Sequence, residues 1–363
     1  MSAQPRVSLL MPVHNRGHLL ELVLTRLAEN TTYENVELIA VDDASTDESP
    51  EIMRRFAEGG TFPEVRVLAN DGNGAIAALN TALNAATGEL CVQLDDDITV
   101  ETRGWIERMV EFMQIDDLVG LVTGKIVFDN GEIHGTGVHV IGESGWHERT
   151  TWPSEPLGQR VWLNRVAGRT IEGEAGELET RAAEVDSGIG ALMMYRREDA
   201  LAAGGYDMEW SPVWFDDVDL SIGIRLLGRK VFYIPDVRAI HYFQHRWKPI
   251  AAHRRAWTRV RRAFGRRIGS RLPIRLTSYI ESRYPIDIRG YYTTDQCRRL
   301  HHHHAYWREK WGWDARNPDL AEIERRFGDT ELWWAHDPAR RAEGERIAEA
   351  YEAIREARAA QSV

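Results

Sequence analysis

Cysteine is scarce in this chain. Among its 363 residues only Cys91 and Cys297 are cysteines, and Cys91 lies in an apolar run that is typical of a buried strand. A disulfide framework needs paired cysteines, so we do not expect one here. A reducing cytoplasm fits this cysteine content.

Long apolar runs are missing as well. No stretch approaches the roughly 20 apolar residues that a helix needs to cross a bilayer. The N-terminus, "MSAQPRVSLLMPVHNRG", has no basic region followed by a long apolar core, so we do not expect a signal peptide. We therefore predict a cytoplasmic protein.

Positive charge is sparse in the first two thirds of the chain. Residues 1–244 contain 20 Lys and Arg against 40 Asp and Glu, whereas residues 245–312 contain 17 against 4. A change of sign this sharp indicates a change of domain or role. We therefore divide the chain into a domain of residues 1–244 and a C-terminal helical region of residues 245–363.

Strand and helix patterns alternate over the first hundred residues. The apolar strands end in polar residues, and the helices carry apolar residues at helical spacing. The predicted strands are 6–13, 36–45, 65–71 and 89–97, and the predicted helices are 17–30, 47–59 and 73–88. This alternation predicts βαβ units, that is, an α/β fold with a mostly parallel sheet flanked by helices.

The pattern loosens after residue 100. Residues 142–182 are rich in Gly, Trp, Glu and Arg without clear periodicity, which indicates a flap or insertion. Strongly helical segments follow at 253–272 and 338–361. No internal repeat is visible.

Three aspartates, Asp95, Asp96 and Asp97, follow the fourth predicted strand. In parallel sheets, ligands bind beyond the carboxyl ends of the strands. Carboxylates there favour a hard divalent cation such as Mg²⁺ or Mn²⁺, and one of them can instead accept hydrogen bonds from ribose. The alternative is a solvated acidic turn.

Asp43 ends the second strand and is placed to accept from a base N–H or a ribose hydroxyl. We assign Asp47 and Ser49 to the turn and the cap of the next helix. Further on, Asp216, Asp217 and Asp219 lie at a helix start. Capping and the helix dipole account for Asp219. A second carboxylate there is suited to act as general base on an acceptor hydroxyl.

Histidines stand at two notable places. His241 follows an extended apolar stretch, and either a packed imidazole or a metal ligand fits it. The run His301 to His304 lies among Arg and Trp. We interpret it mainly as the polar face of a helix, with adventitious metal binding as the alternative.

Five segments together resemble the family 2 glycosyltransferases of the GT-A fold. They are "VSLLMPVHNRGHLLELVLTRL", "VELIAVDDASTDES", "NAATGELCVQLDDDITV", "GGYDMEW" and "FDDVDLSIGIRLLGRKVFYIPDVRAIHY". The resemblance covers about residues 6–245. It implies an enzyme that transfers a sugar from a nucleotide diphosphate sugar, commonly linked to UDP or GDP, to an acceptor hydroxyl. Inversion and Mn²⁺ or Mg²⁺ are usual in this family.

The resemblance also implies roles for single residues. The nucleotide sugar would contact residues from four segments: Pro12, His14, Asp43, Asp95, Asp96, Gly188 and Gly190. Metal would be held by Asp97 with Asp95 and His241, as part of a DxD pattern. Asp217 would be the catalytic base, and Asp216 would orient the acceptor in place of the commoner Glu.

One feature departs from the family. Many relatives carry a basic residue near the diphosphate after the third strand, where this chain has "GNGAIAALN". Neutralisation would then fall on the metal, or on an Arg from the flap or the C-terminal region.

Other functions compete with glycosyl transfer. Sugar nucleotidyltransferases need a glycine-rich loop with Arg and Lys after the first strand, which "MPVHNRGH" does not provide. The basic segment 245–312 carries interleaved aromatics that suit an anionic membrane surface or nucleic acid. The chain would then be a peripheral membrane enzyme, or a binding protein with a non-catalytic domain. Packing of this segment on the acidic domain is the simpler alternative. The amphipathic terminal helix also leaves a homo-oligomer open.

Overall fold

The protein is described by a computed structural model over residues 4–129, 131, 133–140, 162–163, 180–242, 294–315 and 319–361. At its start, four strands alternate with three helices, as predicted. These elements are β1 (Val7–Val13), α1 (Gly17–Asn30), β2 (Val36–Asp43), α2 (Ser49–Glu58), β3 (Val65–Asn70), α3 (Ala75–Ala85) and β4 (Leu90–Leu94).

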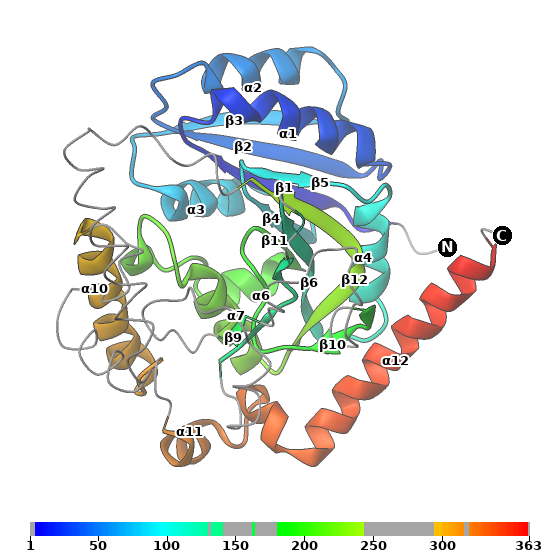
Figure 1. Ribbon diagram of the computed structural model, residues 1–363, viewed down its shortest axis with the longest axis vertical. Helices are drawn as coiled ribbons and strands as arrows, with labels where there is room; N and C mark the ends of the chain where they lie inside the picture. The colour runs from blue at the N-terminus through cyan, green and yellow to red at the C-terminus, as the bar shows by residue number, and fades with distance from the viewer. Residues whose placement is uncertain are drawn as a thin grey trace.

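The parallel part of the sheet follows from the order of these strands. β1 pairs with β2 and with β4, and β2 pairs with β3, all in parallel. The chain moves outward from β1 to β3 and then returns to β4. Because such crossovers are right-handed, α1 and α2 lie on one face of the sheet and α3 on the other (Figure 1). All four strands therefore end at the same edge.

The rest of the sheet is mixed rather than parallel. Its elements are β5 (Ile98–Val100), α4 (Trp105–Met113), β6 (Val119–Phe128), β7 (Ile133–Gly135), β10 (Ala183–Glu184), β11 (Leu192–Arg196), α6 (Arg197–Ala202), η2 (Met208–Trp210), α7 (Asp216–Leu226) and β12 (Lys230–His241). The strand order is β10-β12-β6-β11-β4-β1-β2-β3, and β11 runs antiparallel between β4 and β6. The predicted α/β fold is confirmed, with a change of strand direction at β11.

Most of the predicted flap, residues 142–182, lies outside the described residues, as does the predicted helix 253–272. Two short strands, β8 (Val138–His139) and β9 (Trp162–Leu163), pair with each other beside the main sheet.

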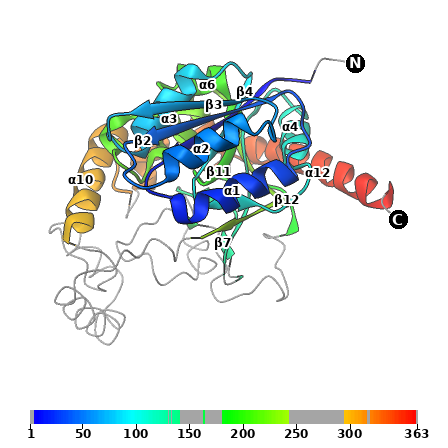
Figure 2. The same ribbon diagram turned by 90° about the horizontal axis from the view of Figure 1, so that it is seen from above.

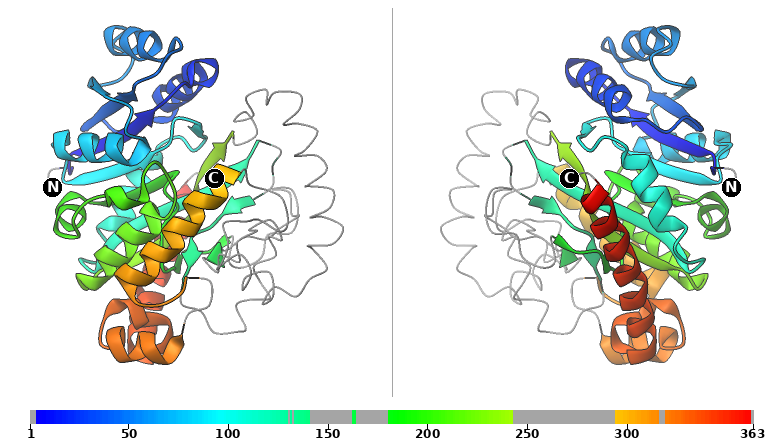
Figure 3. Two further views of the ribbon diagram at one scale, coloured as in Figure 1. Left: turned by 90° about the vertical axis from the view of Figure 1, so that its left-hand side faces the viewer. Right: turned by 90° about the vertical axis from the view of Figure 1, so that its right-hand side faces the viewer.

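The C-terminal helices pack back onto the sheet domain. They are α10 (Thr294–Trp311), α11 (Leu320–Phe327), η5 (Glu331–His336) and α12 (Pro338–Gln361). α12 contacts β10 and η5, and Tyr351 on α12 packs edge-on against Phe112 of α4. Figure 3 shows α10 and α12 on different sides of the molecule, and Figure 2 shows them at opposite ends of the view, with α10 on the left and α12 on the right.

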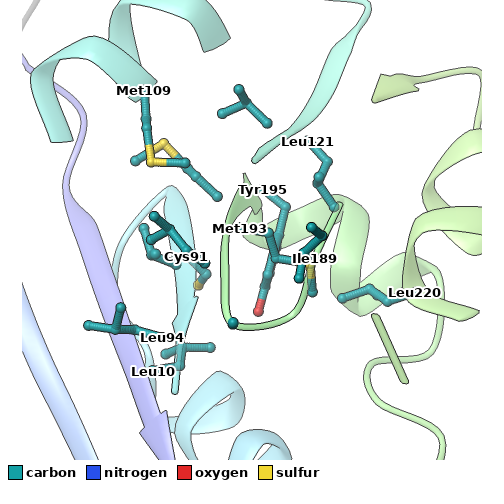
Figure 4. Packing of buried hydrophobic residues seen from close by; sticks show 14 of the residues in the cluster. Leu10, Cys91, Leu94, Met109, Leu121, Ile189, Met193, Tyr195 and Leu220 are labelled. Carbon is teal, nitrogen blue, oxygen red and sulfur yellow. The ribbon is translucent and has the colours of Figure 1, made fainter. Parts of the chain in front are cut away.

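The core lies where β4, β11 and β6 meet the covering helices. Figure 4 shows Cys91 and Tyr195 among apolar side chains such as Leu10, Leu94 and Met193. Cys91 and Cys297 are both buried, and they do not form a disulfide with each other. Within the described residues, no helix has the length and the apolar character needed to cross a membrane.

Candidate active site

The three aspartates after β4 lie between two strands. Asp95 to Asp97 connect β4 to β5, and β5 pairs with the end of β12, so that Ile98 lies opposite His241. This pairing brings Oδ1 of Asp97 to 3.2 Å from Nε2 of His241. Asp97 is fully buried and His241 is 5% exposed. Two residues that lie 144 positions apart in the sequence thus meet through one short ladder.

Ligand atoms of Asp95, Asp97 and His241 all lie within 4.8 Å of one another. This is the set for which the family resemblance implies metal binding. The donors are two carboxylates and one imidazole, a set that suits Mn²⁺ well, whereas Mg²⁺ prefers oxygen donors throughout. The residues therefore fit a divalent cation of the manganese type.

Arg16 approaches the aspartates from the loop after β1. Its Nε donates to Oδ1 of Asp96 at 2.9 Å, and its Nη2 lies 3.2 Å from Oδ2 of Asp97. The second oxygen of Asp96 accepts from the backbone N–H of His14. Burial raises the pKa of Asp96 to about 6, while the Arg16 charge opposes this shift. Through these hydrogen bonds Asp96 connects the loop after β1 to the loop that carries the three aspartates.

Asp43, at the end of β2, has one oxygen bound and one open. Its Oδ2 accepts from the backbone N–H of Gly74 at 2.8 Å, and Gly74 has a φ of +94°, which favours glycine. Its Oδ1 is buried and accepts no hydrogen bond from the described residues. An unsatisfied buried carboxylate oxygen is costly, and a ligand N–H would satisfy it.

Asp216 and Asp217 begin α7, directly after the bulky residues Trp214 and Phe215. Oδ2 of Asp217 accepts from the backbone N–H of Gly190, and Oδ1 accepts from that of Val218. Burial raises the pKa of Asp216 to about 8, and the charges of Asp217 and Asp95 add to the shift. Burial also raises the pKa of Asp217, against the pull of its backbone donors. Burial and the neighbouring like charges thus favour the protonated form of Asp216.

The segment before β11 packs against these carboxylates. A Cβ on Gly190 would lie 2.8 Å from Nε2 of Gln93 and 3.1 Å from Cβ of Asp217, so the close approach requires glycine. A Cβ on Gly188 would meet Leu121 instead. Gly190 thus has a specific reason to lie beside Asp217, and Gly188 is packed on the core.

Other predicted residues have more local roles in this structure. Pro12 is buried within β1 opposite Val41. The His14 ring is exposed, and its Nδ1 lies 2.7 Å from the carbonyl oxygen of Asp43. Asp47 accepts from Ser49 and from the N–H of Gly17, which agrees with its predicted role in the turn. Nucleotide contacts by Pro12, His14, Asp95 and Asp96 remain predictions.

Sequence reasoning missed three residues near the site. Arg16 places a basic group beside Asp96 and Asp97, and "HNRG" already puts it just after a strand end. Gln93 accepts from the hydroxyl of Tyr206 and contacts Asp216. His134 lies against His241, at 2.9 Å between their Nδ1 atoms. No local pattern indicates the last two.

Comparison with known families adds an independent observation. Residues 8–170 match the model of glycosyl transferase family 2. The matched residues include Asp43, Asp95 and Asp97 of this site, but not Asp217 or His241. The predicted resemblance is therefore confirmed.

Two relatives that match about two thirds of this chain are much longer than it. An uncharacterized protein of Sinorhizobium fredii is 28% identical over 246 residues, which are 67% of this chain and 25% of the relative. The O-antigen biosynthesis protein RfbC of Myxococcus xanthus is 27% identical over 245 residues, 66% of this chain and 17% of the relative. The chain thus spans a quarter or less of the length of these two proteins.

A solved structure confirms the fold. GalNAc-T7, in a crystal structure with UDP, GalNAc and Mn²⁺, superposes with a TM-score of 0.52 at 18% identity, over 77% of this chain and 55% of that chain. The sheet and its flanking helices have the GT-A fold.

Proposed function

We propose that the protein is a metal-dependent, inverting glycosyltransferase that moves a sugar from a nucleotide diphosphate sugar to an acceptor hydroxyl. One juxtaposition carries this function. The donor atoms of Asp95, Asp97 and His241 gather at the same sheet edge as Asp216 and Asp217, close enough for the Asp95 charge to act on Asp216. A cation site beside a half-buried carboxylate pair would supply both the charge stabilisation and the base that transfer from a diphosphate uses.

The cation would supply positive charge beside the diphosphate, which becomes more negative as it leaves. Asp95, Asp97 and His241 would hold it. Arg16 keeps Asp96 and Asp97 oriented through its two contacts. The cation and the guanidinium of Arg16 would then balance the negative charges of the adjacent aspartates.

Asp217 is the base in this mechanism. Its two backbone donors stabilise the carboxylate, so the negative charge of the pair lies on Asp217 while Asp216 keeps the proton. Asp217 takes the proton of the acceptor hydroxyl as that oxygen bonds to the anomeric carbon. The bond from that carbon to the diphosphate oxygen breaks, and the nucleoside diphosphate leaves. One base and one displacement give inversion.

The open oxygen of Asp43 favours a sugar donor whose nucleotide carries a pyrimidine base. Its single open oxygen matches a base with one N–H at its pairing edge, as in uracil, whereas guanine presents two such donors. The co-crystallised UDP of GalNAc-T7 is compatible with this choice. We propose UDP-linked sugars as the preferred donors.

The test is a screen of UDP- and GDP-linked sugars for Mn²⁺-dependent release of the nucleoside diphosphate, with Asp97→Asn as the control. We expect release from at least one UDP-sugar, and its loss in the variant. Absence of release and of thermal stabilisation by every donor would exclude this function. Release from GDP-sugars alone would exclude the assignment of uracil to Asp43.

A further inference from the structure

His134 and His241 form a pair of imidazoles beside the aspartates. Their Nδ1 atoms are 2.9 Å apart and their ring centroids 4.8 Å apart. Nε2 of His241 points the other way, to within 3.2 Å of Asp97. The ring of Phe128 stacks on both imidazoles. Its centroid lies 4.6 Å from that of His134 and 6.3 Å from that of His241.

The sheet sets this arrangement. β6 has β7 on one side and β12 on the other, so that His134 and His241 come from strands that flank β6. His241 lies directly opposite Phe128, the last residue of β6, and Val127 pairs with Ile133, the neighbour of His134. The two rings therefore meet over the end of β6 rather than through a flexible loop.

Hydrogen bonding between two neutral imidazoles fixes their tautomers. Of two facing Nδ1 atoms, one carries the hydrogen and the other accepts it. A histidine that binds metal through Nε2 must have its lone pair there and its hydrogen on Nδ1. His241 is then the donor and His134 the acceptor, with the hydrogen of His134 on its own Nε2.

We propose that His134 is a positioning residue that holds His241 in the tautomer and orientation needed for metal binding through Nε2. A histidine that binds metal commonly donates the N–H of its other ring nitrogen to an acceptor such as a carboxylate, a carbonyl or a water, and here the acceptor would be Nδ1 of His134. His134 is not itself in the group of ligand atoms that gather within 4.8 Å, which among the described residues is Asp95, Asp97 and His241. This role rests on the proposed metal-dependent function.

Two substitutions at position 134 separate the hydrogen bond from packing. His134→Phe keeps a ring to stack on Phe128 and removes the acceptor. His134→Asn loses the ring and keeps an amide oxygen close to the position of Nδ1. His302→Gln, an exposed histidine on α10, is the matched control, and His241→Ala is the reference for a lost ligand.

Mn²⁺ binding to the full chain is measured by electron paramagnetic resonance of free Mn²⁺, without nucleotide and with UDP or GDP. We expect His134→Phe to weaken Mn²⁺ binding by about 10- to 100-fold, and His134→Asn to weaken it by less than about threefold. His302→Gln should leave it unchanged. Thermal midpoints establish that each variant is folded.

Two results overturn the assignment in different ways. If His134→Phe and His134→Asn both bind Mn²⁺ as tightly as the unchanged chain while His241→Ala does not, His134 has no part in the site. If His134→Phe keeps its affinity and only His134→Asn loses it, ring packing rather than the hydrogen bond is responsible. If the unchanged chain binds no Mn²⁺ under any of these conditions, the metal-dependent function itself fails.

Discussion

Asp216 and Asp217 are adjacent, half-buried carboxylates whose surroundings favour different protonation states. Asp217 accepts two backbone hydrogen bonds, and the pKa of Asp216 is raised to about 8 by burial and by neighbouring charges. Asp217→Asn should lower kcat by about 10²- to 10⁴-fold with little change in donor affinity. Asp216→Asn resembles the protonated acid and should cost much less at pH 7. The measurements are kcat at saturating donor and the donor Kd for both variants.

Equal losses in the two variants would contradict this division of roles. A loss of less than about tenfold in Asp217→Asn would remove Asp217 as the base. Both side chains change by the same isosteric replacement, so each variant is the control for the other.

Glu37 is a buried carboxylate far from the chemistry and reports on stability alone. It accepts from the hydroxyl of Ser8, from the N–H and hydroxyl of Thr87, and from Arg66. Burial acts to raise the pKa of Glu37, but these hydrogen bonds outweigh it and the pKa is lowered. Its contribution to folding is therefore present above pH 4.5 and lost as the pH falls through the lower pKa of the folded state.

Glu37→Gln should lower the free energy of unfolding by about 1–3 kcal/mol at pH 7. The difference from the unchanged chain should shrink below about pH 4.5. Urea unfolding at pH 7, 5 and 4 measures this, with the exposed Glu58→Gln as the control. A gap that is constant across these pH values would show that the charge of Glu37 is not responsible.

At the scale of elements, α10 supports the turn that leads into α7. Trp214 and Phe215 have φ angles of 84° and 70°, a region that is unfavourable for bulky residues and costs about 1–3 kcal/mol each. Phe215 packs against Trp210, His304 and Trp307. The next residue is Asp216, so this packing holds the carboxylates in place.

Trp307→Ala should therefore affect both folding and catalysis. We expect a loss of about 3–5 kcal/mol in unfolding free energy, because Trp307 is fully buried. The matched control is Trp105→Ala, another fully buried tryptophan, on α4. Both should lose stability, but only Trp307→Ala should lower kcat at a temperature where both remain folded. Similar kcat values in the two variants would mean that α10 does not control the turn.

Periodicity in the sequence was sufficient for the elements from β1 to β4 and for α7 and β12, because each has a complete local pattern. The direction of β11 was not predictable in this way, since it depends on pairing with β4 and β6, which are distant in sequence. The same holds for the site. Asp97 and Asp217 end or begin recognisable elements, whereas His134 lies in a strand of three residues and matters only through its contact with His241.

At the scale of the whole molecule, the described C-terminal helices are joined to the sheet domain by charge. Residues 294–312, the described end of the basic segment, contact the acidic domain. Lys310 there donates to Asp207 and Asp219. Farther along the chain, Glu331 of η5 pairs with Lys230 of β12. Basic residues of the C-terminal region thus pair with acidic residues of the domain, and an acidic residue of the C-terminal region pairs with a basic residue of the domain. Residues 245–293 lie outside the described part of the chain.

Lys230 is a deeply buried charge in this contact. Its side chain is fully buried, with Nζ 2.8 Å from Glu331 and 3.6 Å from Glu184. Removal of one partner from a buried pair leaves an uncompensated charge, at about 3–5 kcal/mol, whereas removal of both is often nearly neutral. Lys230→Met and Glu331→Gln should each destabilise strongly, and the double variant should recover part of the loss.

Urea unfolding of the two single variants and the double variant gives the coupling energy, which we expect at about 0.5–3 kcal/mol. The exposed pair of Arg26 and Glu29, with side chains 47% and 54% exposed, provides the matched control and should couple by less than about 1 kcal/mol. If the Lys230 and Glu331 effects add without coupling, the ion pair does not join the two regions. Apolar packing, such as that of Tyr351 on Phe112, would then account for the attachment of the C-terminal helices.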